Sequence, residues 1–527
     1  MGIDSQSPRL SWEVNDPRRG ARQTAYRILV VETSSSLEIP DKRIWDSGKV
    51  ISAQSVHVAY GGPALASGGR YYWTVRTWDM DGRPGPFTTP AYWEMGLLER
   101  DDWVAEWIAA PEKATPGSQI LPGDWIWCKA DKAAQAHVFF RTSFSLPEDK
   151  TVRTAFAQLT ADDSFVLYVN GTRCGEASQW RELHVVDLRA HLRPGENIFA
   201  IEAKDDGGAY GLTAGVEITY CDDTSTTLVS GSDWLCTTQS ATGWNLPEFQ
   251  AKNWTPATVI GEYGQGARGR IEYRDPAHSH CFRKEFTLAD EASSGRAYVS
   301  GLGLYELRIN GERVGADTLT PGWTHFPTRV QYQIYDVTPF LKKGANAIAA
   351  QMGNGWWGSI MGGNWRDGMP RFICQLTVTY PDGVQENIVT DETWLVGPSP
   401  ILENSLFDGE TYDARLEQTG WDAADFDDTD WMKAVAALDV SATLVTQATP
   451  PMRTTEQLEA VSITEPSPGV YVFDFGQNHA GRVRLSVSGT HGTRIQIRHS
   501  EILNPDGMLY TDNYRMARAT DVYILKG

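Results

Sequence analysis

A tight hairpin signal occurs twice in this chain, and its repetition constrains the fold more than any other feature. One copy is residues 303–315, GLYELRINGERVG, in which polar and apolar residues alternate as in a half-buried strand. Asn310 and Gly311 then supply the two positive φ angles that a two-residue β-hairpin turn requires. The other copy is residues 165–175, FVLYVNGTRCG. In both copies a glycine follows the turn asparagine by five positions.

The match between the two copies extends well beyond the hairpin. Three further groups recur in the same order and with the same spacing: Phe140, Arg141 and 144–146 as Phe282, Arg283 and 286–288; Asp187, Leu192, Gly195 and Asn197 as Asp336, Leu341, Gly344 and Asn346; and Trp244, Phe249 and Trp254 as Trp421, Phe426 and Trp431. Solenoid and propeller repeats are only about 20–50 residues long, so this repeat is too long to be one of them. The sequence therefore predicts one β-domain present twice.

Short alternating runs in the rest of the chain predict further β-domains, and 527 residues are enough for several. Runs at residues 471–476, 481–487 and 493–498 are typical of strands, and no long amphipathic helix pattern occurs. We therefore expect an all-β chain of tandem β-sandwiches. Its expected domains are a fibronectin type III-like sandwich at 1–103, the two copies at 104–262 and 263–440, and a further β-domain at 441–527.

Charge and hydropathy exclude some classes of partner. The formal net charge is −20, whereas a nucleic-acid backbone or an anionic membrane requires clustered Lys and Arg. No apolar run approaches the roughly 18 residues of a membrane span, and no signal-peptide pattern is present. We expect a soluble chain, with the cytoplasm as its compartment. The six cysteines form no C-x-x-C motif and are predicted to be buried free thiols.

Tryptophan content and two acidic pairs indicate a sugar site. The chain has 20 tryptophans, and an aromatic ring can cover the apolar face of a pyranose, although any single tryptophan is more often a core residue. Asp162-Asp163 precedes the first hairpin strand, and Asp205-Asp206 follows the expected strand at residues 197–203. Carboxylates from two loops are the hard oxygen ligands that Ca²⁺ prefers, and Trp180 lies between the pairs. The alternative is that both pairs are ordinary solvated turns.

Two features of the second copy allow more than one interpretation. Glu410 and Asp413 are three residues apart and resemble a glycosidase pair, but a structural pairing of Asp413 with Arg415 is favoured. Residues 353–358, GNGWWG, are followed by Trp365 and lack the Gly-Lys-Ser/Thr of a phosphate loop. Exposed tryptophans on such a loop suit a sugar or a contact between domains.

Several stretches resemble, in their residues and in their order, the N-terminal half of bacterial α-L-rhamnosidases, glycoside hydrolase family 78. They are residues 2–4 with 8–12, 72–76 with 78–79, 301–315 with 321–324, 335–338, 352–357, 409–415, 474–478, 501–503 and 521–525. The resemblance implies a fibronectin-like domain, two jelly rolls and a further β-domain, followed by an α/α barrel with the inverting carboxylates. The chain ends before any such barrel, so no catalytic residue has a matching position in it.

The first copy resembles the rhamnose-binding module of carbohydrate-binding module family 67. In that family an Asp-Asn pair before the hairpin strand and an Asn on a later loop hold Ca²⁺ and the sugar. Asp162 and Asp163 occupy the pair, and Asp205 stands at the later asparagine. The resemblance thus implies Ca²⁺ on Asp162, Asp163 and Asp205, with Asp in place of Asn at Asp163 and Asp205. Trp180 is expected beside the sugar from its position between the acidic pairs.

Two functions follow from these observations. The first is the non-catalytic part of an α-L-rhamnosidase, which binds L-rhamnose-containing glycans or glycosides and buttresses the catalytic barrel. The second is a free-standing glycan-binding array of β-domains. The reading frame after Gly527 would separate them, because a helical barrel needs about 350–400 further residues.

Overall fold

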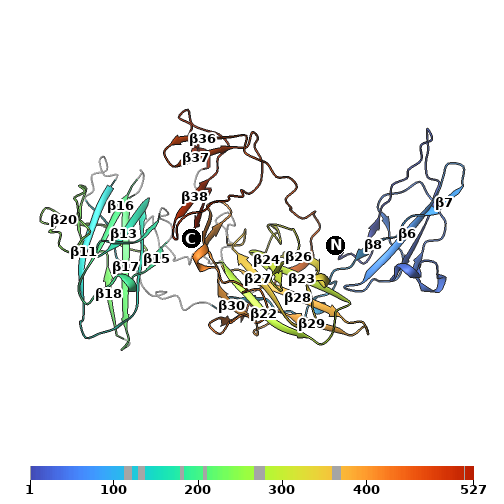
Figure 1. The fold of residues 1–527 in the computed structure, drawn as a ribbon, viewed down its shortest axis with the longest axis horizontal. Coiled ribbons are helices and arrows are strands. Elements are labelled where there is room, and N and C mark those ends of the chain that lie inside the picture. Colours follow the sequence, from blue (N-terminus) through green and yellow to red (C-terminus); the bar gives the residue numbers. More distant parts are fainter. Residues whose placement is uncertain are drawn as a thin grey trace. The chain divides into compact units, whose positions relative to one another are not determined.

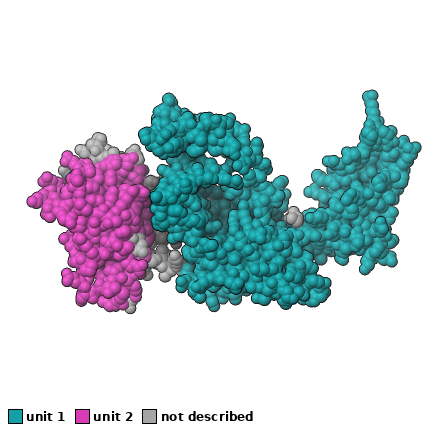
Figure 2. Space-filling view, in the orientation of Figure 1, with its two compact units in different colours: residues 1–111, 277–527 teal, residues 112–276 magenta. Residues whose placement is uncertain are grey.

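A computed structural model describes residues 2–111, 122–128, 137–177, 183–205, 210–222, 224–265, 279–358, 369–438, 440–514 and 517–527. Regular structure in these ranges is β-strand with short 3-10 helices, which confirms the all-β prediction (Figure 1). No helix in the described part of the chain is long and apolar enough to cross a membrane. Residues 112–276 form one compact unit, and residues 1–111 with 277–527 form the other (Figure 2). Trp180, Asp206 and Trp365 lie outside the described ranges.

The first domain is a small β-sandwich. Its main sheet has the order β3-β2-β6-β7, with β4 added to β2 and β8 to β6, while β1 pairs with β5. Glu94 is 5% exposed, and its carboxylate contacts Arg296 Nη2 of the second copy at 3.0 Å. The strands are β1 (Arg9–Leu10), β2 (Ala25–Val31), β3 (Arg43–Asp46), β4 (Val50–Ile51), β5 (Val58–Ala59), β6 (Arg70–Trp78), β7 (Pro84–Phe87) and β8 (Ala91–Glu94).

The first copy, called the first sandwich below, is two antiparallel sheets within residues 122–265. One has the order β14-β13-β16-β11-β19-β20; the other is β15-β12-β17-β10-β21, with β18 added to β17. The strands are β10 (Trp125–Trp127), β11 (His137–Leu146), β12 (Val152–Asp162), β13 (Ser164–Val169), β14 (Thr172–Ala177), β15 (His184–Asp187), β16 (Gly195–Lys204), β17 (Gly211–Tyr220), β18 (Ser225–Val229), β19 (Leu235–Thr237), β20 (Thr255–Pro256) and β21 (Thr258–Gly261).

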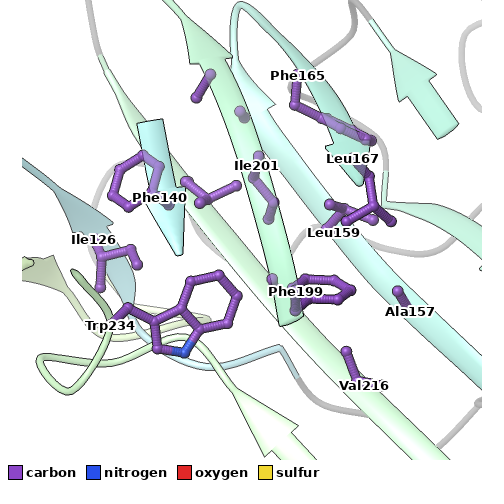
Figure 3. Packing of buried hydrophobic residues seen from close by; sticks show 14 of the residues in the cluster. Ile126, Phe140, Ala157, Leu159, Phe165, Leu167, Phe199, Ile201, Val216 and Trp234 are labelled. Atoms are coloured by element: carbon purple, nitrogen blue, oxygen red, sulfur yellow. The ribbon is translucent and has the colours of Figure 1, made fainter. Parts of the chain in front are cut away.

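The core of the first sandwich lies between its two sheets. Phe140 and Phe199 come from one sheet and Leu159 from the other, and Trp234 packs beside them (Figure 3). All four side chains are fully buried. Burying an aromatic or leucine side chain stabilises a fold by about 1.5–3 kcal/mol, so this layer holds the sheets together.

The second copy, called the second sandwich, has the same strand order. Its sheets are β25-β24-β27-β22-β30-β33 and β34-β9-β28-β23-β26-β35, with β29 added to β28. Strand β35 (Thr443–Thr446), parallel to β26, has no counterpart in the first sandwich. The strands are β9 (Ile108–Ala109), β22 (His280–Leu288), β23 (Ser294–Leu302), β24 (Leu304–Ile309), β25 (Glu312–Arg313), β26 (Arg329–Asp336), β27 (Gly344–Gly353), β28 (Arg371–Thr379), β29 (Gln385–Val389), β30 (Leu395–Pro398), β33 (Met432–Lys433) and β34 (Val435–Ala436).

Strand β9 changes the expected boundary between the copies. It pairs with β28 and β34 of the second sandwich, at the place that β10 occupies in the first. The first sandwich is therefore inserted after the first strand of the second, and residues 104–111 do not belong to the first copy. A strand of two residues carries no alternation, so the sequence could not assign it to either copy.

Both predicted hairpin turns form. Asn170 and Gly171 have φ angles of 50° and 83°, and Asn310 and Gly311 have 51° and 86°. These positive angles match the right-handed twist of the flanking strands. Strand β24 alternates half-buried and buried residues along its whole length, as predicted.

The C-terminal region differs from its prediction in two ways. Strands β31 (Ile401–Ser405) and β32 (Gly409–Asp413), which precede residue 441, join β39 (Thr520–Ile524) and β38 (Arg494–Arg498) in one sheet. Residues 481–487, all of them described, form no strand. The remaining elements are β35 (Thr443–Thr446), β36 (Ser462–Ser467), β37 (Val470–Asp474) and the 3-10 helices Ser34–Ser36, Pro40–Lys42, Arg100–Asp102, Arg189–His191, Thr338–Phe340, Ala414–Leu416 and Asp512–Tyr514.

The cysteine prediction is wrong for four of the six residues. Cys128 and Cys236 are buried and joined in a disulfide, with their Cα atoms 5.6 Å apart. Cys174 is half-buried and Cys221 is exposed, whereas Cys281 and Cys374 are buried thiols as expected. The disulfide partners are separated by 108 residues, so their proximity comes from the pairing of the sheets and has no local sequence signal.

Candidate functional site

The candidate site lies at one end of the first sandwich, at a corner between its two sheets. Strand β12 ends at Asp162 in one sheet, and β13 begins at Ser164 in the other, so Asp163 alone makes the corner. Asp162 pairs with Gly211 at the start of β17 and is 3% exposed. The corner thus holds one carboxylate residue inside the sandwich and a second, half-buried one beside it.

The third predicted ligand, Asp205, meets the same corner. The backbone N–H of Asp163 donates to the carbonyl oxygen of Lys204 at 2.6 Å, and Ser164 lies opposite Lys204 in the β13–β16 ladder. Asp205 is the next residue along, at the end of β16, and is half-buried. The three predicted carboxylate residues therefore come from adjoining strand ends, as the sequence analysis expected.

Two aromatic residues that the sequence did not indicate, Trp125 and Tyr210, lie near the corner. A side chain at Gly211 would meet the ring of Trp125, which is fully buried. Tyr210 immediately precedes Gly211, and its ring centroid lies 5.8 Å from that of Trp127. The only local signal for Tyr210 is its place between an acidic glycine-rich loop and a strand, and Trp125 reaches the corner through a sheet partner distant in sequence.

The donor chemistry of the corner fits a hard cation. Asp162, Asp163 and Asp205 offer carboxylate oxygens, which are the usual ligands of Ca²⁺. Within the ranges that the structure describes, no group of three or more His, Cys, Asp or Glu is arranged to hold a metal ion. The corner therefore supplies the ligand types without a closed set of ligands among the described residues.

The second sandwich has a different chemistry at the equivalent corner. Leu302 and Gly303 stand where Asp162 and Asp163 stand in the first, and Leu302 is 2% exposed. A side chain at Gly303 would lie 2.4 Å from the carbonyl oxygen of Gly353, so the corner is closed by its own backbone. A carboxylate corner is thus a property of the first sandwich and not of the shared fold.

Glu410 and Asp413 do not form an acid–base pair. Both lie on β32, where residues three apart point to opposite faces of the sheet. Asp413 accepts from Arg415 Nε at 2.8 Å and Nη2 at 2.7 Å, and this guanidinium lowers the pKa of Asp413. Burial and the nearby Asp521 raise the pKa of Glu410. The structural interpretation of Asp413 is confirmed.

The described part of the glycine–tryptophan loop packs within its own unit. Trp357 donates to the carbonyl oxygen of Met369 at 3.2 Å, and its ring meets Phe326 edge-on at 5.8 Å. Trp356 stacks on Trp323 at 6.3 Å, and Trp323 is 53% exposed. The exposed aromatic face is therefore that of Trp323, with Trp356 and Trp357 half-buried beneath.

Three family models match the chain, and all describe the same class of enzyme. They are the Rha78A-like N-terminal immunoglobulin domain at residues 1–99, the α-L-rhamnosidase N-terminal domain at 290–456 and the bacterial α-L-rhamnosidase concanavalin-like domain at 464–527. The chain corresponds to the N-terminal domains of bacterial α-L-rhamnosidases. The first sandwich lies between two of the matched ranges, as expected for an inserted domain.

Relatives extend this correspondence over the whole chain. An α-L-rhamnosidase of Streptomyces avermitilis is 40% identical over 100% of this chain and 52% of its own length. A crystal structure of that organism's α-L-rhamnosidase complexed with L-rhamnose superposes with a TM-score of 0.84 at 39% identity, again over 100% of this chain and 52% of that one. The α-L-rhamnosidase structure from Dictyoglumus thermophilum gives a TM-score of 0.64 at 27% identity, over 100% of this chain and 43% of that one. The chain therefore spans about half the length of these rhamnosidases.

Proposed function

We propose that this chain is the non-catalytic, sugar-binding part of an α-L-rhamnosidase, an inverting glycoside hydrolase that removes terminal α-L-rhamnose from glycosides or polysaccharides. Its first sandwich, a jelly roll by family resemblance, binds L-rhamnose with the help of Ca²⁺. The observation that carries this proposal is the carboxylate corner. There a backbone hydrogen bond from Asp163 to Lys204 brings Asp163 beside Asp205, the residue after Lys204. The family matches support the same substrate class.

Electrostatics explain why a cation belongs at this corner. A carboxylate at a buried or half-buried place loses hydration, and a nearby cation favours its charged form. In this proposal a divalent ion draws oxygens of the buried Asp162 and the half-buried Asp163 and Asp205 together and offsets that loss. When bound, Ca²⁺ also accepts neighbouring hydroxyl groups of a sugar as ligands. Trp180, which lies between the acidic pairs in the sequence, is outside the described residues and carries no part of this proposal.

The remaining domains position the catalytic part of the enzyme. Residues 464–527 match the concanavalin-like domain, and their neighbourhood exposes apolar side chains. Ile463, Tyr471 and Phe473 are 59%, 58% and 46% exposed. Such a surface suits contact with the catalytic α/α barrel of the family, which is the partner that we propose for it.

Calorimetric titration with L-rhamnose tests the binding site. We expect a dissociation constant in the millimolar to micromolar range, or about −4 to −8 kcal/mol, in the presence of Ca²⁺. EDTA should abolish binding, and so should Asp163→Ala. The matched control is Asp222→Ala, which removes an exposed carboxylate after the opposite end of β17. Binding that survives both EDTA and Asp163→Ala would refute the site, as would no binding in Ca²⁺.

An activity assay tests the non-catalytic assignment separately. The purified chain should not hydrolyse an aryl α-L-rhamnoside, because Asp413 is held by Arg415 and faces away from Glu410. Turnover that disappears in Glu410→Gln would overturn this part of the proposal and make Glu410 catalytic. That result would leave the rhamnose site of the first sandwich untouched.

A further inference from the structure

A hollow of about 310 Å³ lies between the second sandwich and strand β32. It lies beside the Asn310-Gly311 turn, between the end of the hairpin and the loop of residues 417–422. The residues that line it are Cys281, Arg308, Gly311, Gln351, Pro398, Pro400, Tyr412, Glu417, Gln418, Thr419, Gly420, Trp421 and Asp422.

The first sandwich provides an internal comparison, because the same place is filled there. Phe139 packs edge-on against Trp244 at 5.0 Å, and Tyr168 packs on the same ring at 5.7 Å. A side chain at Gly171 would lie 2.4 Å from Leu246. The equivalent residues of the second sandwich, in the same order, are Cys281, Trp421, Arg308, Gly311 and Ala423.

One large-to-small replacement borders the hollow, because Cys281, which lines it, stands where the first sandwich has Phe139. The tryptophan of the packed cluster is retained as Trp421. Gly311 and Gly420 are exposed, and nothing lies within 4 Å of a side chain added at either, so the hollow opens to solvent on this side. Protein interiors are close-packed, and a volume that could hold several waters of ~30 Å³ is unusual unless polar groups line it.

An ion pair forms one wall of the hollow. Arg308 replaces Tyr168, and its Nε contacts Asp422, which is 6% exposed. The guanidinium also contacts Glu306 Oε1 at 2.9 Å and donates to the carbonyl oxygen of Gly311 at 3.2 Å. Burial and Asp422 raise the pKa of Cys281 to about 12, so its thiol is neutral and contributes space rather than reactivity.

The other wall offers neutral polar groups and aromatic surface. Tyr412 donates its hydroxyl to Glu417 Oε1 at 2.9 Å, and Glu417 also pairs with Lys526. Gln351 donates to Ser399 Oγ at 2.9 Å, and Gln418 Oε1 accepts from Trp431 at 3.2 Å. Both carboxylates that line the hollow already have a cation, so its charges are balanced. The hollow therefore suits a neutral ligand rather than an ion.

We propose that this hollow is a second sugar-binding site, for one neutral monosaccharide unit, and that it works without Ca²⁺. Fixed guanidinium, carboxylate and amide groups match the paired hydroxyls of a sugar, and Trp421 and Tyr412 add apolar ring surface. The volume falls within the ~300–1,000 Å³ range of small-molecule pockets. This site is separate from the carboxylate corner of the first sandwich and does not depend on it.

Ligand-observed saturation-transfer NMR tests this site on the full chain carrying Asp163→Ala, in EDTA, so that the proposed calcium site is disabled. L-Rhamnose, D-galactose and D-glucose are the probes. We expect saturation transfer to at least one of them. Cys281→Phe, which restores the residue of the first sandwich, should reduce the signal at least ten-fold, whereas Cys281→Ser should keep it within two-fold.

A second variant covers the case in which phenylalanine disturbs the fold. Gln351→Leu keeps the size of the side chain, removes one amide from the lining and should weaken binding at least five-fold. The proposal is overturned if none of the three sugars shows transfer in EDTA, or if Cys281→Phe and Gln351→Leu leave the signal unchanged. Binding seen only with Ca²⁺ and an intact Asp163 would belong to the first sandwich, and would overturn this site alone.

Discussion

The two sandwiches have equivalent strands and hairpin turns but differ in the side chains at three places. In each, the turn asparagine is bonded in the same way: Asn170 and Asn310 each donate to a second asparagine at 2.8 Å and each accept from a backbone N–H at 2.9 Å. The differences lie at the carboxylate corner, at the disulfide and at the hollow. Each turn asparagine with its hydrogen-bonding partners is called the polar frame of its sandwich. The fold retains this frame in both sandwiches, while residues outside it differ.

The second shared feature is an arginine bonded to the backbone of a stacked tryptophan pair, called the aromatic clamp below. Arg141 donates to the carbonyl oxygen of Trp244 at 2.9 Å, and Arg283 donates to that of Trp421 at 3.0 Å. The stacked tryptophan pairs behind them have ring distances of 6.1 and 6.3 Å, with interplanar angles of 26° and 25°. The geometry is nearly the same in both sandwiches, whereas the neighbouring residues differ. The same substitution at two equivalent positions therefore shows what those neighbours contribute to stability.

Loss of the clamp arginine should destabilise both sandwiches, the second more than the first. Arg283 is completely buried and contacts Glu285 and Asp428, whereas the partners of Arg141 are backbone carbonyls. Orphaning buried carbonyls costs about 1–3 kcal/mol in either variant. Arg283→Ala also removes the cation beside Glu285 and Asp428, whose side chains are 41% and 26% exposed, which adds about 1 kcal/mol or less. We expect Arg283→Ala to destabilise its unit more than Arg141→Ala does. Urea unfolding, with hydrogen exchange followed in each unit, measures both; equal losses would contradict the comparison.

Reduction of the disulfide should affect only the first sandwich. Cys128 and Cys236 are 108 residues apart, and closing a loop of about 100 residues stabilises a fold by up to about 4.7 kcal/mol. We expect a reductant to lower the melting temperature of the unit at residues 112–276 and to leave the other unit unchanged. In the second sandwich valine (Val396) stands at the position of Cys236, so Cys236→Val is the matched, reductant-insensitive control. Six free thiols in the unreduced, denatured chain would show that the pair does not form.

The sequence predicted the features that depend on local chemistry. Asn-Gly turns and matched spacings identified both hairpins and the duplication, because positive φ angles restrict the residues that can stand there. Asp162, Asp163 and Asp205 were singled out from the acidic pairs beside strands and from the family resemblance. They lie at adjoining strand ends, and their role as ligands stays a prediction.

Features that depend on long-range pairing were not predictable. Strand β9 is two residues long and separated from its partners by the inserted sandwich. Cys128 follows β10 in one sheet and Cys236 lies on β19 in the other, so they meet only because the two sheets pack together. Residues 481–487 alternate as a strand does, but a strand also needs a hydrogen-bonding neighbour, and Val483, Leu485 and Val487 remain 41–44% exposed. The hollow had no sequence signal, because the small size of Cys281 is noticeable only by comparison with Phe139 at the equivalent place in the first sandwich.

The turn asparagines should sharpen the comparison by giving equal effects. Asn310→Ala removes two donated hydrogen bonds and one accepted one, and places alanine at a φ of 51°. We expect a loss of about 2–3 kcal/mol, and the same loss in Asn170→Ala. Glycine at either position restores the backbone angle but not the hydrogen bonds, so it should recover only part of the loss. Unequal losses in urea unfolding would mean that the two frames are not equivalent.

The turn glycines should give the smallest difference, and it bears directly on the hollow. Gly171→Ala and Gly311→Ala both place a Cβ at positive φ, which costs about 1 kcal/mol in each sandwich. Only the Cβ at Gly171 meets another side chain, Leu246, which has to rotate at a cost of about 0.5 kcal/mol.

A double-mutant cycle isolates that contact. We expect Gly171→Ala to become as mild as Gly311→Ala once Leu246→Ala is also present, because Ala423 already stands at the equivalent place in the second sandwich. The measurement is the difference in unfolding free energy between single and double variants. If Gly311→Ala costs as much as Gly171→Ala in the presence of Leu246, a side chain already occupies the space beside Gly311. In that case the turn side of the hollow is closed and the two sandwiches are packed alike.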